Sequence, residues 1–199
     1  DGVIITTPHA LHYEQAKYCI NKGLHVLVEK PMAITAEEAR DLVAIANEKK
    51  RIIVVGLNPP YWAYCHFLKN LIESGRLGVI EAISINWVGD VGHVFGKIPI
   101  PDSLPGIVPP TLFRADSKLG GGGHLIDTGS HLVSEILWTT GLKATEVTAS
   151  MDNVDMDMRC AVGILLGNDV FCSISMIGDS KIRRRIHNTY FGSKSTVFV

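Results

Sequence analysis

The sequence predicts an α/β fold in which the later half of a doubly wound parallel sheet is followed by an α+β domain with an open, mostly antiparallel sheet. In the first part, strand-like runs over 3–7, 25–29 and 51–57 alternate with helical patterns over 9–21 and 35–46. Strands that alternate with helices over short connections are parallel and are joined by right-handed crossovers. Later in the chain, two helical patterns accompany several strands in succession, which indicates the second domain.

Local signals in the first part support its strands and helices. The β-branched run over 3–7 is closed by Pro8, which is typical of a buried parallel strand. The helix over 9–21 follows, and Gly23 provides its C-terminal stop. Thr35-Ala36-Glu37-Glu38 forms a capping box, so we expect the next helix to begin there.

The regular alternation of short strands and helices ends near residue 58, and we therefore predict domains over 1–58 and 59–199. The run over 80–88 alternates between apolar and polar residues and therefore predicts a half-buried strand. The other expected elements are helices over 61–74 and 122–140, strands over 144–151, 158–166, 169–177 and 184–191, a loop over 99–110, and a tight turn at Gly167-Asn168.

Composition and charge exclude several classes of protein. Hydrophobic residues make up 46% of the 199 residues and charged residues 20%, which is globular composition and argues against disorder. The net charge of −1 lacks the basic excess typical of a nucleic-acid partner. The one basic cluster contains Lys181, Arg183, Arg184 and Arg185; a solvated turn or strand end is favoured there over a phosphate contact.

Cysteine spacing and hydropathy indicate a soluble, cytoplasmic protein with no metal site. The four widely spaced cysteines include no Cys-x-x-Cys pair, so buried free thiols are favoured over disulfides or a zinc site. No apolar run is long enough to predict a membrane span. The chain begins at Asp1 with a strand close behind, and residues 195–199 resemble an unfinished strand. We therefore expect an internal piece of a longer protein.

Lys30 is the first candidate for chemistry. It follows the apolar run over 25–29 and precedes Pro31, which biases its backbone away from helical angles. The carboxyl end of a parallel strand is where open α/β sheets place their ligands. A surface lysine at a strand end is the alternative, but the position favours a functional residue.

The second candidate is the glycine-rich segment that carries Asp127 and His131. Glycines 120–123 permit close approach of the backbone to another group and are costly to order without a reason. At about 100° per residue, His124, His131 and Trp138 lie on the same face as Asp127. A nearby carboxylate raises the pKa of an imidazole and can fix its tautomer, which predicts an acid–base pair. A merely solvated face is the alternative. The opposite, buried face would carry Leu125, Leu132 and Ile136.

With these motifs, the chain resembles the glucose–fructose oxidoreductase, inositol dehydrogenase and MocA (Gfo/Idh/MocA) family of NAD(P)-dependent dehydrogenases. The resemblance covers nearly the whole chain. Its motifs are Thr6-Thr7-Pro8 followed by His12, the run from Gly23 to Glu29-Lys30-Pro31, Gly56-Leu57-Asn58, and the Gly-rich segment leading to Asp127 and His131. The family's fold implies that 1–58 is the C-terminal half of a Rossmann domain. It also implies that 59–199 binds substrate and forms a homo-oligomer through its sheet.

The resemblance also implies a role for each site residue. Lys30, whose bond to Pro31 is often cis in such enzymes, would hydrogen-bond the reacting hydroxyl and steady the alkoxide. His131 would be the general base, and Asp127 would orient it or share that role. Hydride would pass from the carbinol carbon of a sugar, polyol or related cyclic alcohol to the nicotinamide of NAD or NADP. The cofactor would be contacted by Thr6, Thr7, Pro8, His12, Glu29 and Lys30.

Two departures from the family pattern limit this interpretation. The Gly-x-Gly-x-x-Gly turn and the ribose-reading acidic residue are absent from the sequence, so NAD and NADP remain alternatives. Where many relatives have an arginine or a polar aromatic residue, this chain has Pro59-Pro60-Tyr61-Trp62, and Tyr61 or Trp62 is expected to stack on the substrate ring. Two other functions stay open: a nucleotide- or sugar-sensing regulator without turnover, and an NAD-dependent glycosidase.

Overall fold

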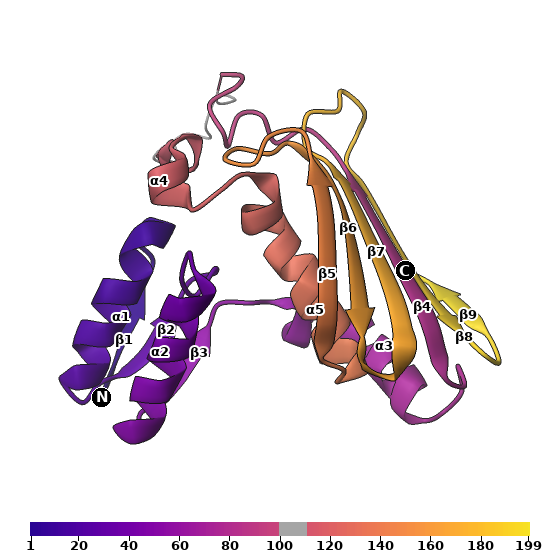
Figure 1. Cartoon of the computed structure of the whole chain (residues 1–199), viewed down its shortest axis with the longest axis horizontal. Helices are drawn as coiled ribbons and strands as arrows, with labels where there is room; N and C mark the ends of the chain where they lie inside the picture. Colours follow the sequence, from indigo (N-terminus) through magenta and orange to yellow (C-terminus); the bar gives the residue numbers. More distant parts are fainter. Residues whose placement is uncertain (100–110) are drawn as a thin grey trace.

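The computed structural model describes residues 1–99 and 111–199, which form two parts, each with its own sheet and core (Figure 1). In the first part, strands β1 (Gly2–Ile5), β2 (His25–Val28) and β3 (Ile53–Val55) form a parallel sheet in that order. Helices α1 (His12–Asn21) and α2 (Ala36–Glu48) pack together on one face of it. The predicted half of a doubly wound sheet is therefore confirmed.

The helices of the first part form as their local signals predict. The Thr35 hydroxyl accepts from Glu38 N, and the Glu38 carboxylate accepts from Thr35 N, so the capping box is complete. A 3₁₀ turn, η1 (His9–Leu11), precedes α1. The core of this part consists of Ile5, Ala16, Ile20, Val26, Val28, Leu42 and Ala46. On the other face of the sheet, Ile4, Leu27 and Val54 pair across the three strands and are exposed.

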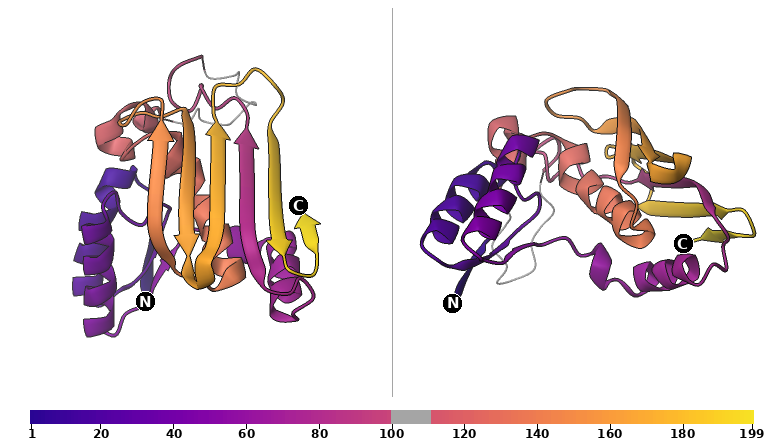
Figure 2. Two further views of the ribbon diagram at one scale, coloured as in Figure 1. Left: turned by 45° about the vertical axis from the view of Figure 1, so that its right-hand side comes forward. Right: turned by 60° about the horizontal axis from the view of Figure 1, so that its bottom comes forward.

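The second part is a six-stranded sheet with the order β5-β6-β7-β4-β8-β9 (Figure 2). Only β4 and β7 pair in parallel, and the other pairs are antiparallel, as predicted for an open sheet of this kind. The strands are β4 (Ile80–Val88), β5 (Ala144–Met151), β6 (Arg159–Leu166), β7 (Val170–Ile177), β8 (Arg185–Gly192) and β9 (Thr196–Phe198).

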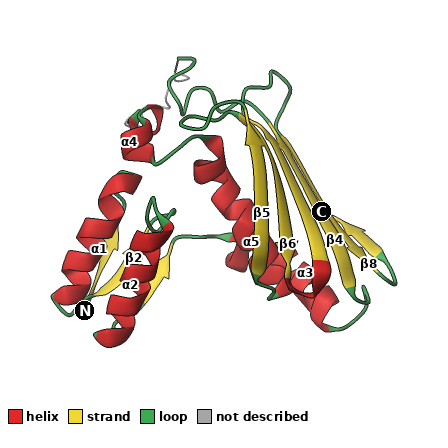
Figure 3. Ribbon diagram, in the orientation of Figure 1, coloured by secondary structure: helices red, strands yellow, loops and turns green. Residues whose placement is uncertain are grey.

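Helices α3 (Ala63–Glu73) and α5 (Ser130–Thr140) pack against the face of this sheet that is turned toward the first part (Figure 3). Alternation places Ile83, Ile85 and Trp87 of β4 in the core, while the serines of β7 point to the open face. Strand β5, at the edge, is exposed along nearly its whole length. The predicted oligomer contact through the open face stays a prediction.

Two predicted helices are interrupted, and both interruptions shape the site. The helix predicted from Tyr61 begins instead at Ala63, because a 3₁₀ turn with two prolines, η2 (Pro59–Tyr61), leads to an extended Trp62. The regular helix predicted over 122–140 is wrong at its start, where a π-helix, η4 (Leu125–Gly129), precedes α5. The remaining short elements are η3 (Phe113–Ala115), α4 (Ser117–Gly120) and η5 (Gly167–Asp169).

Other expectations are confirmed more simply. The turn at Gly167-Asn168 joins β6 to β7, with Asn168 and Asp169 at positive φ. All four cysteines are free thiols, and Cys65, Cys160 and Cys172 are buried. The loop predicted over 99–110 lies, apart from Pro99, outside the described residues. None of the described helices has the length and apolar character needed to cross a membrane.

Candidate active site

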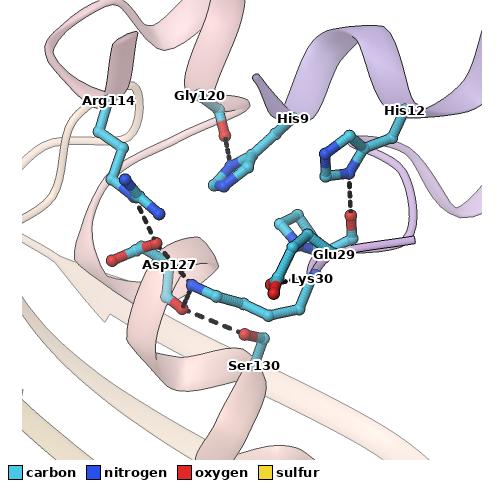
Figure 4. Close-up of polar contacts among 9 residues, drawn as sticks. His9, His12, Glu29, Lys30, Arg114, Gly120, Asp127 and Ser130 are labelled. Carbon is cyan, nitrogen blue, oxygen red and sulfur yellow. Dashed lines mark hydrogen bonds and ion pairs between the residues drawn. The ribbon is translucent and has the colours of Figure 1, made fainter. Parts of the chain in front are cut away.

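The carboxyl ends of β1 and β2 face the start of the helical segment that contains η4 and α5, and Lys30 bridges the two (Figure 4). Lys30 Nζ donates to Asp127 Oδ1 and to Asp127 O, both at 2.6 Å. The Lys30–Pro31 peptide bond is cis. The predicted meeting of Lys30 and Asp127, which are 97 positions apart, is therefore present in the structure.

Asp127 is held between two cations. Arg114 Nε donates to the same Oδ1 that Lys30 contacts, at 2.7 Å, and the side chain of Asp127 is 16% exposed. Burial alone would raise the pKa of Asp127, but the charges and hydrogen bonds of Lys30 and Arg114 outweigh it, so the pKa is lowered. Asp127 is thus kept ionised. Arg114 was not predicted from the sequence, since it lies outside every periodic run.

The glycines before Asp127 are required by close packing. Gly121 has φ +78°, a left-handed conformation, and a Cβ on Gly123 would overlap the backbone of Asp157. Asp157 O accepts from His124 N at 2.8 Å, and its Oδ2 accepts from Leu125 N at 2.9 Å. The loop between β5 and β6 therefore caps the first turn of η4, which only glycine at 123 allows.

His131 lies on the first turn of α5 and lines a cavity of about 750 Å³. Burial, and then the charge of Lys30, lower its pKa, and the opposing effect of Asp127 is smaller. Asp127 does raise this pKa, as predicted, but burial and the charge of Lys30 outweigh its effect, so the net shift is downward. Its Nδ1 is buried and has no hydrogen-bond partner among the described residues. The structure favours a neutral imidazole at this position.

Aromatic rings form one wall of the cavity. Trp62 stacks on Tyr64 with ring centroids 5.5 Å apart, and on His131 with centroids 6.4 Å apart. Tyr61 also lines the cavity and is 77% exposed. Tyr61 and Trp62 thus lie beside His131, as the substrate prediction requires. The full lining is Asn58, Tyr61, Trp62, Ala63, Tyr64, Trp87, Thr128, His131, Leu132, Arg184 and Ile186.

The buried carboxyl group of Glu135 hydrogen-bonds to Tyr64 of this wall. Glu135, one turn after His131, is 0% exposed and accepts from Tyr64 OH at 2.7 Å through Oε2. Its Oε1 accepts from Asn188 Nδ2 at 2.7 Å and from Tyr190 OH at 3.0 Å. Burial raises the pKa of Glu135 more than these hydrogen bonds lower it. Glu135 was not predicted either, although a lone acidic residue on an otherwise apolar helix was an available signal.

The side chain of His12 links two backbone segments of the site. It is 0% exposed, and its two ring nitrogens lie 2.8 Å from Pro31 O and 2.8 Å from Thr7 O. These contacts position the ends of β1 and β2, and the cofactor contact predicted for this side chain stays a prediction. The buried His9, which was not predicted, makes a similar link through Nδ1 to Gly120 O at 2.7 Å.

The remaining predicted cofactor residues lie at the same edge of the parallel sheet. Thr6 and Glu29 are exposed, and Pro8 is half-buried. Thr7 donates to the side-chain oxygen of Gln15 at 2.7 Å. The Glu29 carboxylate accepts from Lys30 N at 3.1 Å. These positions leave the edge open to a ligand, and the contacts themselves stay predictions.

A regular helix would place His124 on the same face as Asp127, but the structure does not. It is 0% exposed and packs edge-on against Trp87, with ring centroids 4.4 Å apart. Burial lowers the pKa of His124 to about 4. The π-helix causes the discrepancy, because its wider turn changes the angle between successive residues. Among residues 1–99 and 111–199, no group of three or more His, Cys, Asp or Glu side chains is placed to hold a metal ion.

Comparison with known proteins gives two adjoining family matches. Residues 1–57 match the oxidoreductase family with an NAD-binding Rossmann fold, and residues 66–197 match the GFO/IDH/MocA C-terminal domain. The chain is 33% identical over 150 residues to scyllo-inositol 2-dehydrogenase (NADP(+)) IolW of Bacillus subtilis, which is 75% of this chain and 37% of that relative. It is 37% identical over 138 residues to glucose-6-phosphate 3-dehydrogenase of the same organism, 69% of this chain and 36% of that relative.

A solved structure shows the same fold. The WlbA dehydrogenase of Bordetella pertussis, in complex with NADH and UDP-GlcNAcA, covers all of this chain with a TM-score of 0.85 and 22% identity. The chain covers 55% of that structure. It therefore spans little more than a third of the two curated relatives and about half of this solved structure.

Proposed function

The chain belongs to the Gfo/Idh/MocA oxidoreductase family, and from that premise we propose that it is part of an NAD(P)-dependent dehydrogenase that oxidises the carbinol carbon of a sugar, polyol or related cyclic alcohol. The observation that carries this proposal is the contact of Lys30 with Asp127 next to the cavity that His131 lines. An ammonium group, an ionised carboxylate and a neutral imidazole are the groups that proton removal from a hydroxyl requires.

In this proposal, His131 is the general base of the reaction. Because burial lowers its pKa, the imidazole is neutral at physiological pH and can accept the hydroxyl proton. The carbon–hydrogen bond then breaks with its electron pair leaving as hydride, and the hydroxyl becomes a carbonyl group. A nicotinamide cofactor supplies the hydride acceptor when it is bound.

Lys30 stabilises the negative charge that develops on the substrate oxygen. Its ammonium has three N–H donors, and two are engaged by Asp127 O and Asp127 Oδ1. One donor is therefore left for the substrate oxygen, while Asp127 fixes the position of the other two. Arg114 helps keep Asp127 ionised, so Asp127 orients Lys30 and is not itself the base.

The residues present fit the nicotinamide side of a dinucleotide. The exposed Thr6 and Glu29, together with Thr7 and Pro8, lie at the carboxyl ends of two neighbouring parallel strands, where sheets of this type bind nucleotides. Lys30 extends from this edge to Asp127, and the next residue, Thr128, lines the cavity. NAD and NADP both remain within the proposal.

The cavity wall suits a ring that carries several hydroxyl groups. Tyr61 and Trp62 offer apolar ring faces, while Asn58 and Thr128 offer polar groups. One relative is named for its action on scyllo-inositol and another for its action on glucose 6-phosphate, and we extend a cyclic substrate to this chain. The proposal takes residues 1–58 as the nucleotide domain and 59–199 as the domain for substrate and for homo-oligomer contact through the open sheet face.

The test uses the full-length protein with Lys30→Ala and His131→Ala. Each variant should lose at least about 10²-fold in kcat on the best sugar or polyol, since a positioned base typically contributes that much. His187→Ala, an exposed histidine on β8, is the matched control and should retain full turnover. Turnover within about threefold of wild type for either site variant contradicts the proposal.

The same assay separates the two other functions. Cofactor binding without hydride transfer on any of a panel of sugars and polyols would indicate a sensing protein. Release of a leaving group from a glycoside, without net reduction of the cofactor, would indicate a glycosidase.

A further inference from the structure

Arg184 contributes a positive charge to the wall of the cavity. It lies immediately before β8, and its guanidinium carbon is 5.5 Å from the centroid of the Trp87 ring. A Cβ on Gly89 would lie 3.4 Å from Arg184 Cβ, so the backbone after β4 packs against the base of the arginine side chain. Cation–π contact with a tryptophan that is 2% exposed restrains the guanidinium at this edge of the cavity.

The structure separates Arg184 from the rest of its basic cluster. All four residues of the cluster are exposed, as expected for a solvated turn, but Lys181, Arg183 and Arg185 are not part of the cavity lining. Arg184 alone of the cluster lines the cavity, beside Trp87 and Ile186, which pair across β4 and β8. One residue of the cluster therefore has a position that the sequence pattern did not favour.

Unlike Arg114 and Arg159, Arg184 has no carboxylate partner among the described residues. Arg114 is paired with Asp127, and Arg159 is paired with Asp179. Within the described residues, Arg184 forms no ion pair, and no acidic side chain belongs to the cavity lining. Its charge reaches the reaction site, since it contributes to the lowered pKa of His131, after burial and Lys30.

We propose that Arg184 selects a substrate that carries an anionic group, a carboxylate or a phosphate, in addition to the hydroxyl that is oxidised. This inference rests on the proposed dehydrogenase function and names the substrate class of the same cavity. Guanidinium binds carboxylate and phosphate through two parallel hydrogen bonds. The ring of the substrate lies against Tyr61 and Trp62, and its anionic group reaches Arg184 on the strand wall.

The experiment compares neutral and anionic substrates on the full-length protein. D-Glucose, D-glucose 6-phosphate, D-glucuronate and myo-inositol are assayed as a panel with wild type, Arg184→Gln and Arg183→Gln. We expect kcat/KM to be at least about 10-fold higher for one of the two anionic sugars than for the neutral compounds. Whether the phosphate or the carboxylate is preferred identifies the anion. Arg184→Gln should lower that value about 10- to 100-fold, mainly through KM, as expected when a charged contact to the substrate is lost.

Arg183→Gln, the neighbouring exposed arginine, is the matched control and should behave as wild type. Preference for neutral substrates, or an equal loss by Arg184→Gln on neutral and anionic substrates, overturns the inference while leaving the dehydrogenase proposal intact. If no compound is oxidised, calorimetry with D-glucose 6-phosphate and D-glucuronate decides. If either compound binds and Arg184→Gln abolishes the binding, the anion site is supported although the dehydrogenase proposal fails. If neither compound binds, or if binding does not depend on Arg184, the anion site is overturned.

Discussion

Asp127 and Glu135 are two buried carboxyl groups on one helical segment, and the protein shifts their pKa values in opposite directions. Asp127 lies between Lys30 and Arg114, and its pKa is lowered. Glu135 receives only neutral donors, and its pKa is raised. Burial opposes ionisation in both, so the charge of the partners decides the outcome. The first carboxyl serves as a fixed negative charge, and the second serves as a hydrogen-bond acceptor that orders an aromatic wall.

Removing the charge of Asp127 should have the largest effect. Asp127→Asn leaves Lys30 and Arg114 close together without their shared carboxylate, and it removes the group that orients Lys30. We expect kcat of the full-length enzyme to fall by at least about 10²-fold and the free energy of unfolding to fall by about 3 kcal/mol, the usual cost of breaking a buried ion pair. Steady-state kinetics and urea unfolding measure the two effects.

Asp41→Asn is the control for this variant, because the side chains of the Asp41–Lys17 pair are 41% and 37% exposed and pairs in contact with solvent contribute little. A stability loss no greater for Asp127→Asn than for Asp41→Asn would show that the two cations do not depend on the carboxylate. The comparison with Glu135 would then have no energetic basis.

The sequence predicted the surroundings of Asp127 far better than those of Glu135. Lys30 and Asp127 were found because a strand end and a glycine run are local signals with a known spatial meaning. The pairing of Asp127 with Arg114 was missed, because it depends on how the segment after residue 111 folds back over η4. His124 was placed on the wrong face because its angular position was taken from a regular helix, whereas a π-helix forms there.

Glu135 illustrates what sequence patterns omit. Its three donors come from α3 and β8, which are distant in the sequence and have no motif that ties them to α5. The stack of Tyr64, Trp62 and His131 depends on the extended conformation of Trp62, which the predicted continuous helix did not allow. Tertiary contacts therefore determined the aromatic wall of the cavity, and local rules determined the edge of the parallel sheet that carries Lys30.

Replacing Glu135 by glutamine should have a smaller effect than the change at Asp127. In Glu135→Gln, one oxygen still accepts from Asn188 and Tyr190, and the new amide can donate to Tyr64 OH, which also acts as an acceptor. We expect a stability loss below about 1.5 kcal/mol and a rise in KM of a few-fold, with kcat within about twofold.

Glu135→Leu is the contrasting variant, because it leaves all three donors without an acceptor and releases the aromatic wall. It should lose about 2 kcal/mol or more, and KM should rise further than in Glu135→Gln. If glutamine is as damaging as leucine in stability and KM, the carboxyl must be ionised, and the contrast with Asp127 disappears.

The smallest effect, and the most direct measure of the contrast, is the pH dependence of stability. A carboxyl whose folded pKa lies below its unfolded value of 3.8 stabilises the protein above pH 3.8 and loses this contribution as the pH falls through the folded value. The advantage of wild type over Asp127→Asn should therefore be constant above about pH 4 and should shrink below it.

The stability contribution of Glu135 should change with pH in the opposite direction, since its folded pKa lies above its unfolded value of 4.5. Its contribution is full below pH 4.5 and is lost as the pH rises through the folded pKa, so wild type should lose stability relative to Glu135→Gln across that range.

Urea unfolding of the full-length proteins from about pH 3 to pH 8 tests these slopes. When the folded and unfolded pKa of a carboxyl differ by one, the stability changes by about 1.4 kcal/mol across the titration. Slopes of the same sign for the two site variants would mean that burial sets both pKa values and that the cations at Asp127 act only on geometry. Opposite slopes would establish that the charge of the partners decides which of the two carboxyl groups is ionised, the one beside Lys30 and Arg114 or the one beside neutral donors.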